Sequence, residues 1–334
     1  MQIAMTGLVD AFGRRITYLR LSVTDRCDLR CVYCMPKQMK FLPKADILTL
    51  DELYSIALAF MRNGVRKIRL TGGEPLVRRD VGDLVQALGA HVGKELDELT
   101  LTTNGTRLTE FAPLLAGAGV RRVNVSLDTL DPETFFKLTR GDILARVMDG
   151  IAAAARAGLA IKINTVALKG INQDELPSLV QWAHERGHTI TLIEVMPMGD
   201  VGEDRIIHHL PLDIVKQALE ERWTLIPSSD TTGGPARYFD LAETGGRLGL
   251  ITPLTNNFCA GCNRVRVTAT GQLYTCLGGE NRADLRAALR SGDAEALNAA
   301  LATAMRQKQH RHSFSIEKQE GSNEVSRHMS VTGG

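Results

Sequence analysis

The strongest constraint on the fold is a repeated alternation of short β-rich runs and longer amphipathic segments from about residue 16 to residue 222. Runs rich in Val, Ile and Thr with a period of two favour strands, and apolar residues three and four apart favour helices. The β-rich runs are residues 16–23, 65–70, 99–103, 120–127, 160–166 and 189–195. Strands that alternate with helices are typical of a parallel sheet. We therefore predict six βα units, two fewer than a closed eight-stranded barrel contains.

Polar and apolar residues alternate within these runs, so the polar residues share one face of the predicted sheet. They are Tyr18, Arg20, Ser22, Lys67, Arg69, Thr71, Thr100, Thr102, Arg122, Asn124, Ser126, Asp128, Lys162 and Asn164. A parallel sheet between helices is apolar on both faces, and a closed barrel is filled with aliphatic side chains. The pattern predicts an open, partial barrel with a polar lumen that binds a ligand. The alternative is that some of these residues face solvent at strand ends.

The pattern changes after residue 221, through Pro227 and a Thr-Thr-Gly-Gly-Pro stretch at 231–235, into short strands and turns. We place a domain boundary near residue 225, which separates residues 1–225 from residues 226–334. Residues 265–268 and 273–275 flank Thr270-Gly271 and predict a hairpin. A helical stretch is expected at about 283–306, followed by a polar tail held only by contacts with the rest of the chain.

Charge and composition exclude several classes of partner. The 40 Lys and Arg residues nearly balance 38 Asp and Glu residues, which argues against general binding to nucleic acid or an anionic membrane. The first 15 residues lack the apolar core of a signal peptide, and the most hydrophobic later stretch, 151–161, is interrupted by Arg156. We expect a cytoplasmic protein, in which six cysteines are better explained as ligands or reactive groups than as disulfides.

Three cysteines follow the first predicted strand with the spacing Cys27-x3-Cys31-x2-Cys34. Structural zinc sites usually pair Cys-x2-4-Cys units to reach four ligands. Three thiolates in one loop instead suit an iron-sulfur cluster with one iron open to a substrate or cofactor. The alternative is a zinc site completed by a distant histidine. The next predicted strand ends in Thr71-Gly72-Gly73-Glu74-Pro75, where glycines would let the backbone approach a ligand closely.

A second set of three cysteines brackets the predicted hairpin, with Cys259 and Cys262 before it and Cys276 at its end. On spacing alone, zinc completed by His310 or His312 remains an alternative to an iron-sulfur cluster. Arg264 and Arg266 lie between these cysteines and share one strand face. Fixed cations beside an open iron would suit an anionic ligand that also binds that iron.

These motifs together resemble the GTP 3′,8-cyclase family of the radical S-adenosylmethionine superfamily. The first cysteine loop, with Tyr33 before its last cysteine, is similar to the cluster-binding motif of the superfamily, and the Gly-Gly-Glu-Pro run is similar to its segment that contacts the amino group of S-adenosylmethionine. The run Thr102-Thr103-Asn104-Gly105, the run Asn-Arg-Val-Arg after Cys262 and the terminal Gly333-Gly334 complete the resemblance, which covers essentially the whole chain.

The resemblance implies an α/β fold, in which a partial (βα)6 barrel is closed by a C-terminal α+β segment that carries a second cluster. It implies a lyase with two 4Fe-4S clusters and S-adenosylmethionine as cofactors. A 5′-deoxyadenosyl radical would abstract hydrogen from C3′ of GTP, and C3′ would then bond to guanine C8 in the first step of molybdenum cofactor biosynthesis. Implied partners are a flavodoxin- or ferredoxin-type electron donor and, downstream, cyclic pyranopterin monophosphate synthase; a monomer and a homodimer are both compatible.

The same resemblance assigns residues to each ligand. The first cluster would bind Cys27, Cys31 and Cys34, and the second would bind Cys259, Cys262 and Cys276 and hold guanine at its open iron. S-adenosylmethionine would contact Tyr33, Gly73, Ser126 and Met196. GTP would contact Arg20, Arg69, Thr102, Lys162, Arg264 and Arg266.

The C-terminal tail would enter the active site, where Gly333 and Gly334, with Arg264 and Arg266, would assist catalysis. The family usually has an aliphatic residue before the glycines, and Thr332 departs from that pattern. Two other classes of protein remain as alternatives. One is a peptide-modifying radical enzyme with an auxiliary cluster, which usually has more C-terminal cysteines; the other is a zinc-containing binding protein without catalysis.

Overall fold

One sheet of twelve strands forms the centre of the computed structural model, which describes residues 7–201, 205–230, 233–256, 258–312, 314 and 325–333. The strand order is β12-β11-β10-β1-β2-β3-β4-β5-β6-β9-β8-β7, and the sheet does not close on itself. The strands are β1 (Tyr18–Ser22), β2 (Lys67–Thr71), β3 (Glu98–Thr103), β4 (Arg122–Ser126), β5 (Ala160–Ala167), β6 (Thr189–Glu194), β7 (Leu225–Ser228), β8 (Arg237–Leu241), β9 (Arg247–Ile251), β10 (Arg264–Val267), β11 (Gln272–Tyr274) and β12 (Arg282–Asp284).

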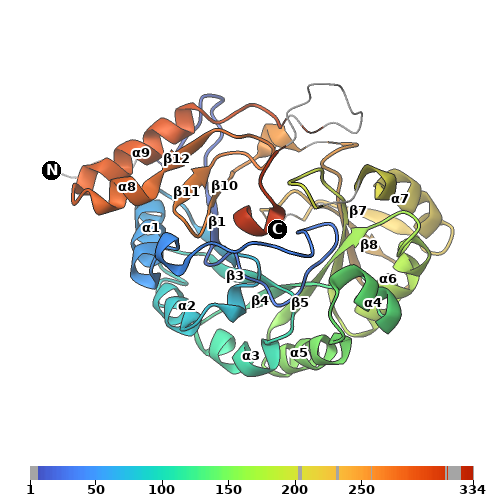
Figure 1. Cartoon of the computed structure of the whole chain (residues 1–334). Helices are drawn as coiled ribbons and strands as arrows, with labels where there is room; N and C mark the ends of the chain where they lie inside the picture. Colours follow the sequence, from blue (N-terminus) through green and yellow to red (C-terminus); the bar gives the residue numbers. More distant parts are fainter. Residues whose placement is uncertain are drawn as a thin grey trace.

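Helices surround the barrel strands on the outside, except α10 (Met329–Thr332), which lies at the middle of the barrel (Figure 1). They are α1 (Leu50–Arg62), α2 (Val81–Gly89), α3 (Leu108–Gly117), α4 (Pro132–Thr139), α5 (Leu144–Arg156), α6 (Leu176–Glu185), α7 (Leu212–Glu220), α8 (Leu285–Arg290), α9 (Ala294–Arg306) and α10 (Met329–Thr332). Short 3-10 helices are η1 (Lys44–Asp46), η2 (Pro75–Val77), η3 (Gln173–Glu175), η4 (Arg205–His208) and η5 (Cys259–Gly261). Within the described ranges, no helix is both long enough and apolar enough to span a lipid bilayer.

The six predicted strands are confirmed as β1 to β6, and all neighbouring pairs among them are parallel. Their apolar residues, including Leu19, Ile68, Val123 and Ile163, are buried in one core with the helices. Each strand can have an apolar outer face because its alternate residues point the other way, into the lumen. The polar face predicted from the alternation is therefore the concave face of the barrel.

The C-terminal residues continue this sheet at both edges. β10 pairs in parallel with β1, and β9 pairs in parallel with β6, so two strands from the second half of the chain flank the six βα units. The predicted hairpin is confirmed as β10 and β11. The single helical stretch expected at 283–306 is wrong in detail, because its first residues form β12 and a turn at Gly292, with φ of +74°, separates α8 from α9. The boundary near residue 225 stays a prediction.

Candidate functional site

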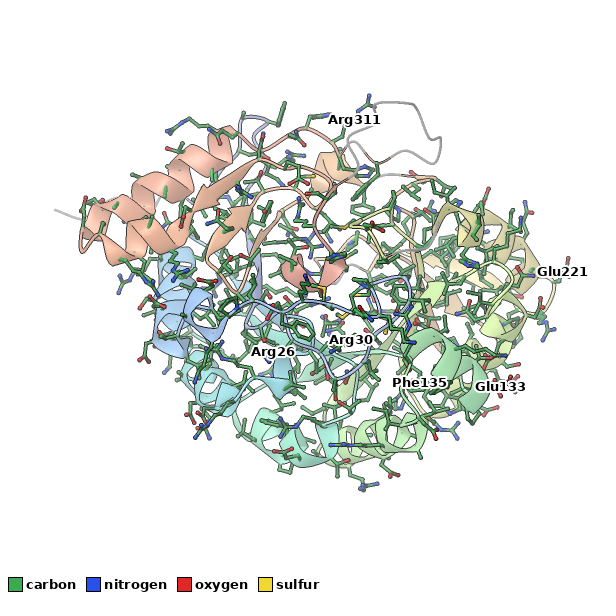
Figure 2. All side chains as sticks on the ribbon, in the orientation of Figure 1. Arg26, Arg30, Glu133, Phe135, Glu221 and Arg311 are labelled. Carbon is green, nitrogen blue, oxygen red and sulfur yellow. The ribbon has the colours of Figure 1, made fainter. Side chains whose placement is uncertain are left out.

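Two adjoining cavities occupy the lumen. The first is lined by the cysteines of the N-terminal loop and the second by the three C-terminal cysteines. Asn164, Ile193 and Met196 line both cavities and so mark where they meet. Arg26 and Arg30 belong to the loop that carries the first cysteines, which passes in front of the strands in Figure 2. The lumen therefore has a sulfur-bearing site on either side of one junction.

The cysteine loop is held by the Gly-Gly-Glu run at the end of β2. Gly73 N donates to the carbonyl of Thr24 at 2.9 Å, and Glu74 N donates to the carbonyl of Arg26 at 2.8 Å. A Cβ atom on Gly73 would lie 2.4 Å from the Arg26 carbonyl oxygen. The close approach at Gly73 is made by the chain's own backbone at Arg26, which places the cysteine loop over the sheet. The predicted approach of a ligand to these glycines stays a prediction.

The first three cysteines are free thiols in one cavity. Burial raises the pKa of Cys31 well above its ordinary value, and the neighbouring sulfurs of Cys34 and Cys27 raise it further. The Cys27 sulfur accepts from Leu29 N at 3.4 Å and from the Asn104 amide at 3.8 Å. N–H donors aimed at sulfur and three mutually repelling thiolates fit an iron-sulfur cluster, whose irons neutralise the thiolates.

The donors of both cysteine sets are spread apart rather than gathered at one point. In the part of the chain that the structure describes, no three His, Cys, Asp or Glu side chains meet closely enough to hold a single metal ion. In a 4Fe-4S cluster each thiolate binds a different iron.

The charge environment of the second set favours a thiolate. Burial raises the pKa of Cys262, but Arg264 and Lys308 more than offset this effect and bring the pKa to about 7. That environment favours a thiolate ligand.

The residues expected to contact S-adenosylmethionine, which are Tyr33, Gly73, Ser126 and Met196, all line the first cavity. Sequence reasoning assigned no role to two buried carboxyl groups beside them. Asp128 accepts from the Tyr33 hydroxyl at 2.7 Å and from Val166 N at 2.8 Å, and burial raises its pKa to about 6. Glu74 accepts from Asn104 N at 2.6 Å and from the Thr103 hydroxyl at 2.8 Å, and burial raises its pKa to about 7. Glu74 thus joins the ends of β2 and β3.

Most residues expected to contact GTP line the second cavity. Arg20, Arg69, Lys162, Arg264 and Arg266 are there with the three C-terminal cysteines, whereas Thr102 lines the first cavity. Register explains part of this cluster, because Arg20 is paired with Arg69 on one neighbouring strand and with Arg266 on the other. Three guanidinium side chains therefore project from adjacent strands into the lumen.

Carboxylates divide the cations of the polar face into two groups. Glu98 pairs with Lys67 and Arg122, in each case at 2.5 Å. Among the residues described, no carboxylate forms an ion pair with Arg20, Arg69 or Lys162. Arg20, Arg69 and Lys162 are therefore available to an anionic ligand. Glu98 carried no signal in the sequence, because its role depends on which strands lie beside β3.

Burial and mutual repulsion perturb these cations. Burial, together with Arg69 and Arg264, lowers the pKa of Arg20 to about 10 against an opposing contribution from Tyr18. Burial and then Arg69 lower the pKa of Lys162 far below its ordinary value. The Lys162 ammonium donates to the Tyr238 hydroxyl of β8 at 2.5 Å, a contact that the sequence did not indicate. The site concentrates positive charge that a polyanion would relieve.

The C-terminal tail reaches the lumen, with its end at the middle of the barrel in Figure 1. The Arg266 guanidinium donates to the carbonyls of Thr332 and Gly333, and Met329 and Ser330 line the first cavity. Gly333 has a φ of +73°, and a Cβ atom there would lie 2.0 Å from the Thr71 hydroxyl oxygen, so only glycine fits. Thr332 is fully buried, and among the described residues its hydroxyl has no hydrogen-bond partner. Gly334 lies outside the described residues.

Comparison with known proteins adds the family. Residues 21–183 match the Radical SAM superfamily, and residues 188–314 match the family described as Molybdenum Cofactor Synthesis C. The chain is 65% identical to a GTP 3′,8-cyclase of Erythrobacter litoralis over 99% of this chain and 100% of that protein. It is 57% identical to a GTP 3′,8-cyclase of Bradyrhizobium diazoefficiens over 98% of this chain and 96% of that protein.

Solved structures agree on the fold. SuiB of Streptococcus suis bound to S-adenosylmethionine aligns with a TM-score of 0.62 at 16% identity, over 86% of this chain and 68% of that one. SuiB bound to its precursor peptide SuiA aligns with a TM-score of 0.65 at 14% identity, over 96% of this chain and 77% of that one. These identities support the fold alone. The high identity to whole-length relatives goes further, and the chain belongs to the family of GTP 3′,8-cyclases within the radical SAM superfamily.

Proposed function

We propose that this chain is a radical SAM GTP 3′,8-cyclase, a lyase that catalyses the first step of molybdenum cofactor biosynthesis. The observation that carries the proposal is the pair of adjoining cavities, one with three thiols and the other with three further thiols and cations that form no ion pair with a carboxylate in the described residues. A hydrogen-abstracting cofactor and a nucleotide would thus meet at the junction beside Met196. The family of the closely similar relatives supports the same reaction.

The first cavity would hold one 4Fe-4S cluster on Cys27, Cys31 and Cys34, with S-adenosylmethionine beside it. When bound, they would supply one-electron cleavage of S-adenosylmethionine and abstraction of hydrogen from C3′ of GTP, after which C3′ would bond to guanine C8 and one electron from the electron donor with a proton would complete the product. Tyr33 and Ser126 line this cavity and would orient the cofactor. Orientation matters because an alkyl radical attacks almost any C–H bond, so the lumen must hold C3′ closest to it and exclude water.

The second cavity would hold the triphosphate on Arg20, Arg69, Lys162, Arg264 and Arg266. A nucleoside triphosphate carries about four negative charges, and fixed guanidinium groups bind such anions through paired, charge-assisted hydrogen bonds. Burial lowers the pKa of Lys162, and a bound triphosphate would restore it by supplying the missing anion. Local cations thereby explain how a chain of net charge +2 binds a highly charged nucleotide. Thr102 lines the other cavity and would face the ribose from the cofactor side.

A second 4Fe-4S cluster on Cys259, Cys262 and Cys276 would hold guanine. Metal analysis separates this arrangement from the zinc alternative. We expect about eight iron atoms and eight acid-labile sulfides per chain after anaerobic reconstitution, as two 4Fe-4S clusters require. Stoichiometric zinc on the second set would contradict the second cluster.

The reaction itself is tested with GTP deuterated at C3′. The reconstituted enzyme, given reductant and S-adenosylmethionine, should transfer deuterium into 5′-deoxyadenosine, which mass spectrometry of that product detects. Unlabelled 5′-deoxyadenosine that forms at the same rate with and without GTP would preserve the radical chemistry but overturn GTP as the substrate, and would favour a peptide substrate instead.

Several finer assignments belong to the same proposal. Arg264, Arg266, Gly333 and Gly334 would assist catalysis from the closed end of the lumen, where Arg266 holds the tail. The electron donor would be a flavodoxin- or ferredoxin-type protein, and the product would pass to cyclic pyranopterin monophosphate synthase. The enzyme would act in the cytoplasm as a monomer or homodimer.

A further inference from the structure

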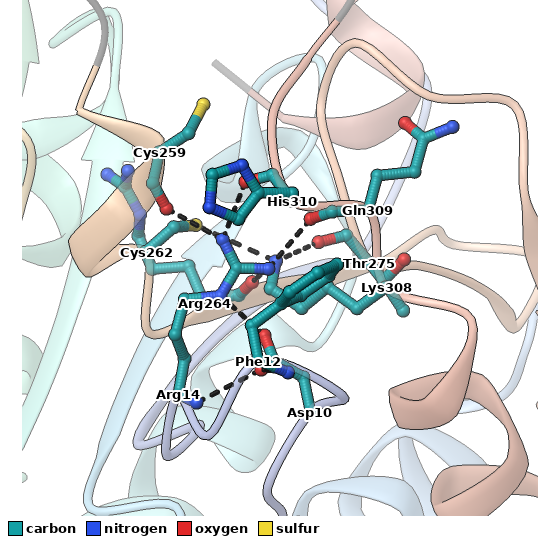
Figure 3. A network of polar contacts seen from close by, with 10 residues as sticks. All are labelled: Asp10, Phe12, Arg14, Cys259, Cys262, Arg264, Thr275, Lys308, Gln309 and His310. Atoms are coloured by element: carbon teal, nitrogen blue, oxygen red, sulfur yellow. Dashed lines mark hydrogen bonds and ion pairs between the residues drawn. The ribbon is translucent and has the colours of Figure 1, made fainter.

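A buried lysine lies against the second set of cysteines. Lys308 follows α9 and is 3% exposed. Its ammonium donates to the carbonyls of Arg264, at 3.1 Å, and Thr275, and to the Cys262 sulfur at 3.6 Å (Figure 3). An ammonium has three N–H donors, so these three acceptors use all of them.

The partners of Lys308 flank two of the cysteines. Arg264 begins β10 two residues after Cys262, and Thr275 immediately precedes Cys276. The single Lys308 ammonium therefore links the start of β10, just after Cys262, to the residue that follows β11, just before Cys276. This tie adds to the strand pairing of β10 and β11 beside Cys262 and Cys276.

The charge of Lys308 lacks a carboxylate partner. In the described ranges no Asp or Glu forms an ion pair with it, although a buried cation is costly unless an anion balances it. Arg14, beside it in Figure 3, differs in this respect. Arg14 pairs with Asp10 at 2.6 Å and donates to the carbonyls of Cys259, Gln309 and His310, and within the described part of the chain it has no hydrogen bond to sulfur. The anion available to Lys308 is the thiolate of Cys262.

We propose that Lys308 is a positioning residue for the second cluster, and that its charge, hydrogen-bonded to the Cys262 sulfur, stabilises the reduced form of that cluster. The inference rests on the proposed function, because it requires a 4Fe-4S cluster on the C-terminal cysteines. One electron from a low-potential reductant adds one negative charge to the cluster and breaks no bond, and a fixed ammonium stabilises that charge. The charge of Lys308 also offsets the mutual repulsion of three neighbouring thiolates at this site.

The test isolates the second cluster in a full-length chain with Cys27, Cys31 and Cys34 changed to Ala. Iron and sulfide near four per chain, together with an EPR signal on reduction, establish the cluster independently of Lys308. Lys308→Gln, which keeps hydrogen-bond donors without the charge, is then compared with Lys308→Arg, which keeps the charge. Lys216→Met on α7, a lysine that pairs with Glu220 and does not line the cavity of the C-terminal cysteines, is the matched control.

We expect Lys308→Gln to lower the ratio of reduced to oxidised cluster at least tenfold at a fixed potential, which corresponds to a shift of about 59 mV for one electron. Lys308→Arg and Lys216→Met should remain within about twofold of the parent. A Lys308→Gln protein that holds full iron and titrates like the parent would overturn the inference. A parent chain that binds zinc or no iron would instead refute the second cluster itself. If Lys308→Gln loses its iron while Lys308→Arg retains it, the positioning role is supported.

Discussion

Gly73 offers the sharpest test of how the cysteine loop is positioned. A Cβ atom there would lie 2.4 Å and 2.6 Å from the carbonyl oxygen and carbon of Arg26, and 2.7 Å from the carbonyl oxygen of Asp25. All three are backbone atoms, so no side-chain rotation relieves the overlap. Overpacking of this kind costs about 1–3 kcal/mol. The φ of Gly73 is not in the left-handed region, so the expected cost is steric.

The matched control is Gly117, the last residue of α3, which has no heavy atom within 4 Å of a built Cβ. Gly117→Ala should stabilise the fold by about 0.5–1 kcal/mol, because alanine has less freedom to lose on folding. The same substitution chemistry is therefore expected to give opposite signs at the two positions. The sign depends only on what the methyl group meets.

The assay is equilibrium urea unfolding of the reduced, iron-free chain, followed by circular dichroism, since bound cofactors would add their own stabilisation. Gly73→Ala should lower the free energy of unfolding by about 1–3 kcal/mol with an unchanged denaturant slope. It should also lower the affinity of the reconstituted enzyme for S-adenosylmethionine, because the loop moves. If Gly73→Ala is as stable as the parent, or if both variants destabilise alike, the proposed contact between the glycine and the loop is wrong.

Three further predictions concern buried polar groups. Lys162→Met should weaken GTP binding about tenfold to a hundredfold, the loss expected for a charged hydrogen bond. Because burial lowers the pKa of Lys162, GTP binding to the parent above neutral pH should be accompanied by uptake of a proton, which calorimetry in two buffers detects. Equal heats in both buffers would contradict the lowered pKa of Lys162. Thr332→Val removes a buried hydroxyl that has no hydrogen-bond partner in the described residues. It should stabilise the C-terminal tail in the lumen by about 1 kcal/mol, which slower digestion by carboxypeptidase would show. Faster digestion would refute this prediction. Burial raises the pKa of Glu74 to about 7, so the contribution of Glu74 to stability is present at low pH and is lost as pH rises through about 7. Glu74→Gln should therefore flatten the fall of the unfolding free energy between about pH 5 and 8. An unchanged dependence of the unfolding free energy on pH would exclude Glu74 as the cause of that fall.

The six parallel βα units of the barrel core and its polar lumen could be predicted from the sequence. Alternation along each strand is local, because backbone geometry sends successive side chains to opposite faces. Leu19 and Ile68 therefore had to face away from Arg20 and Arg69, whatever lay beside them. The cysteine spacing is equally local, since three thiols within one short loop can reach one cluster without help from the rest of the chain.

Tertiary structure decided which of these groups meet and which are neutralised. Arg266 lies beside Arg20 only because β10, far along the chain, pairs with β1. Glu98 pairs with Lys67 rather than with Lys162 because of where β3 lies in the sheet. Lys308 reaches Cys262 from the segment after α9. Contacts of this kind depend on strand register and helix packing between distant segments, and no periodicity within a single segment encodes them.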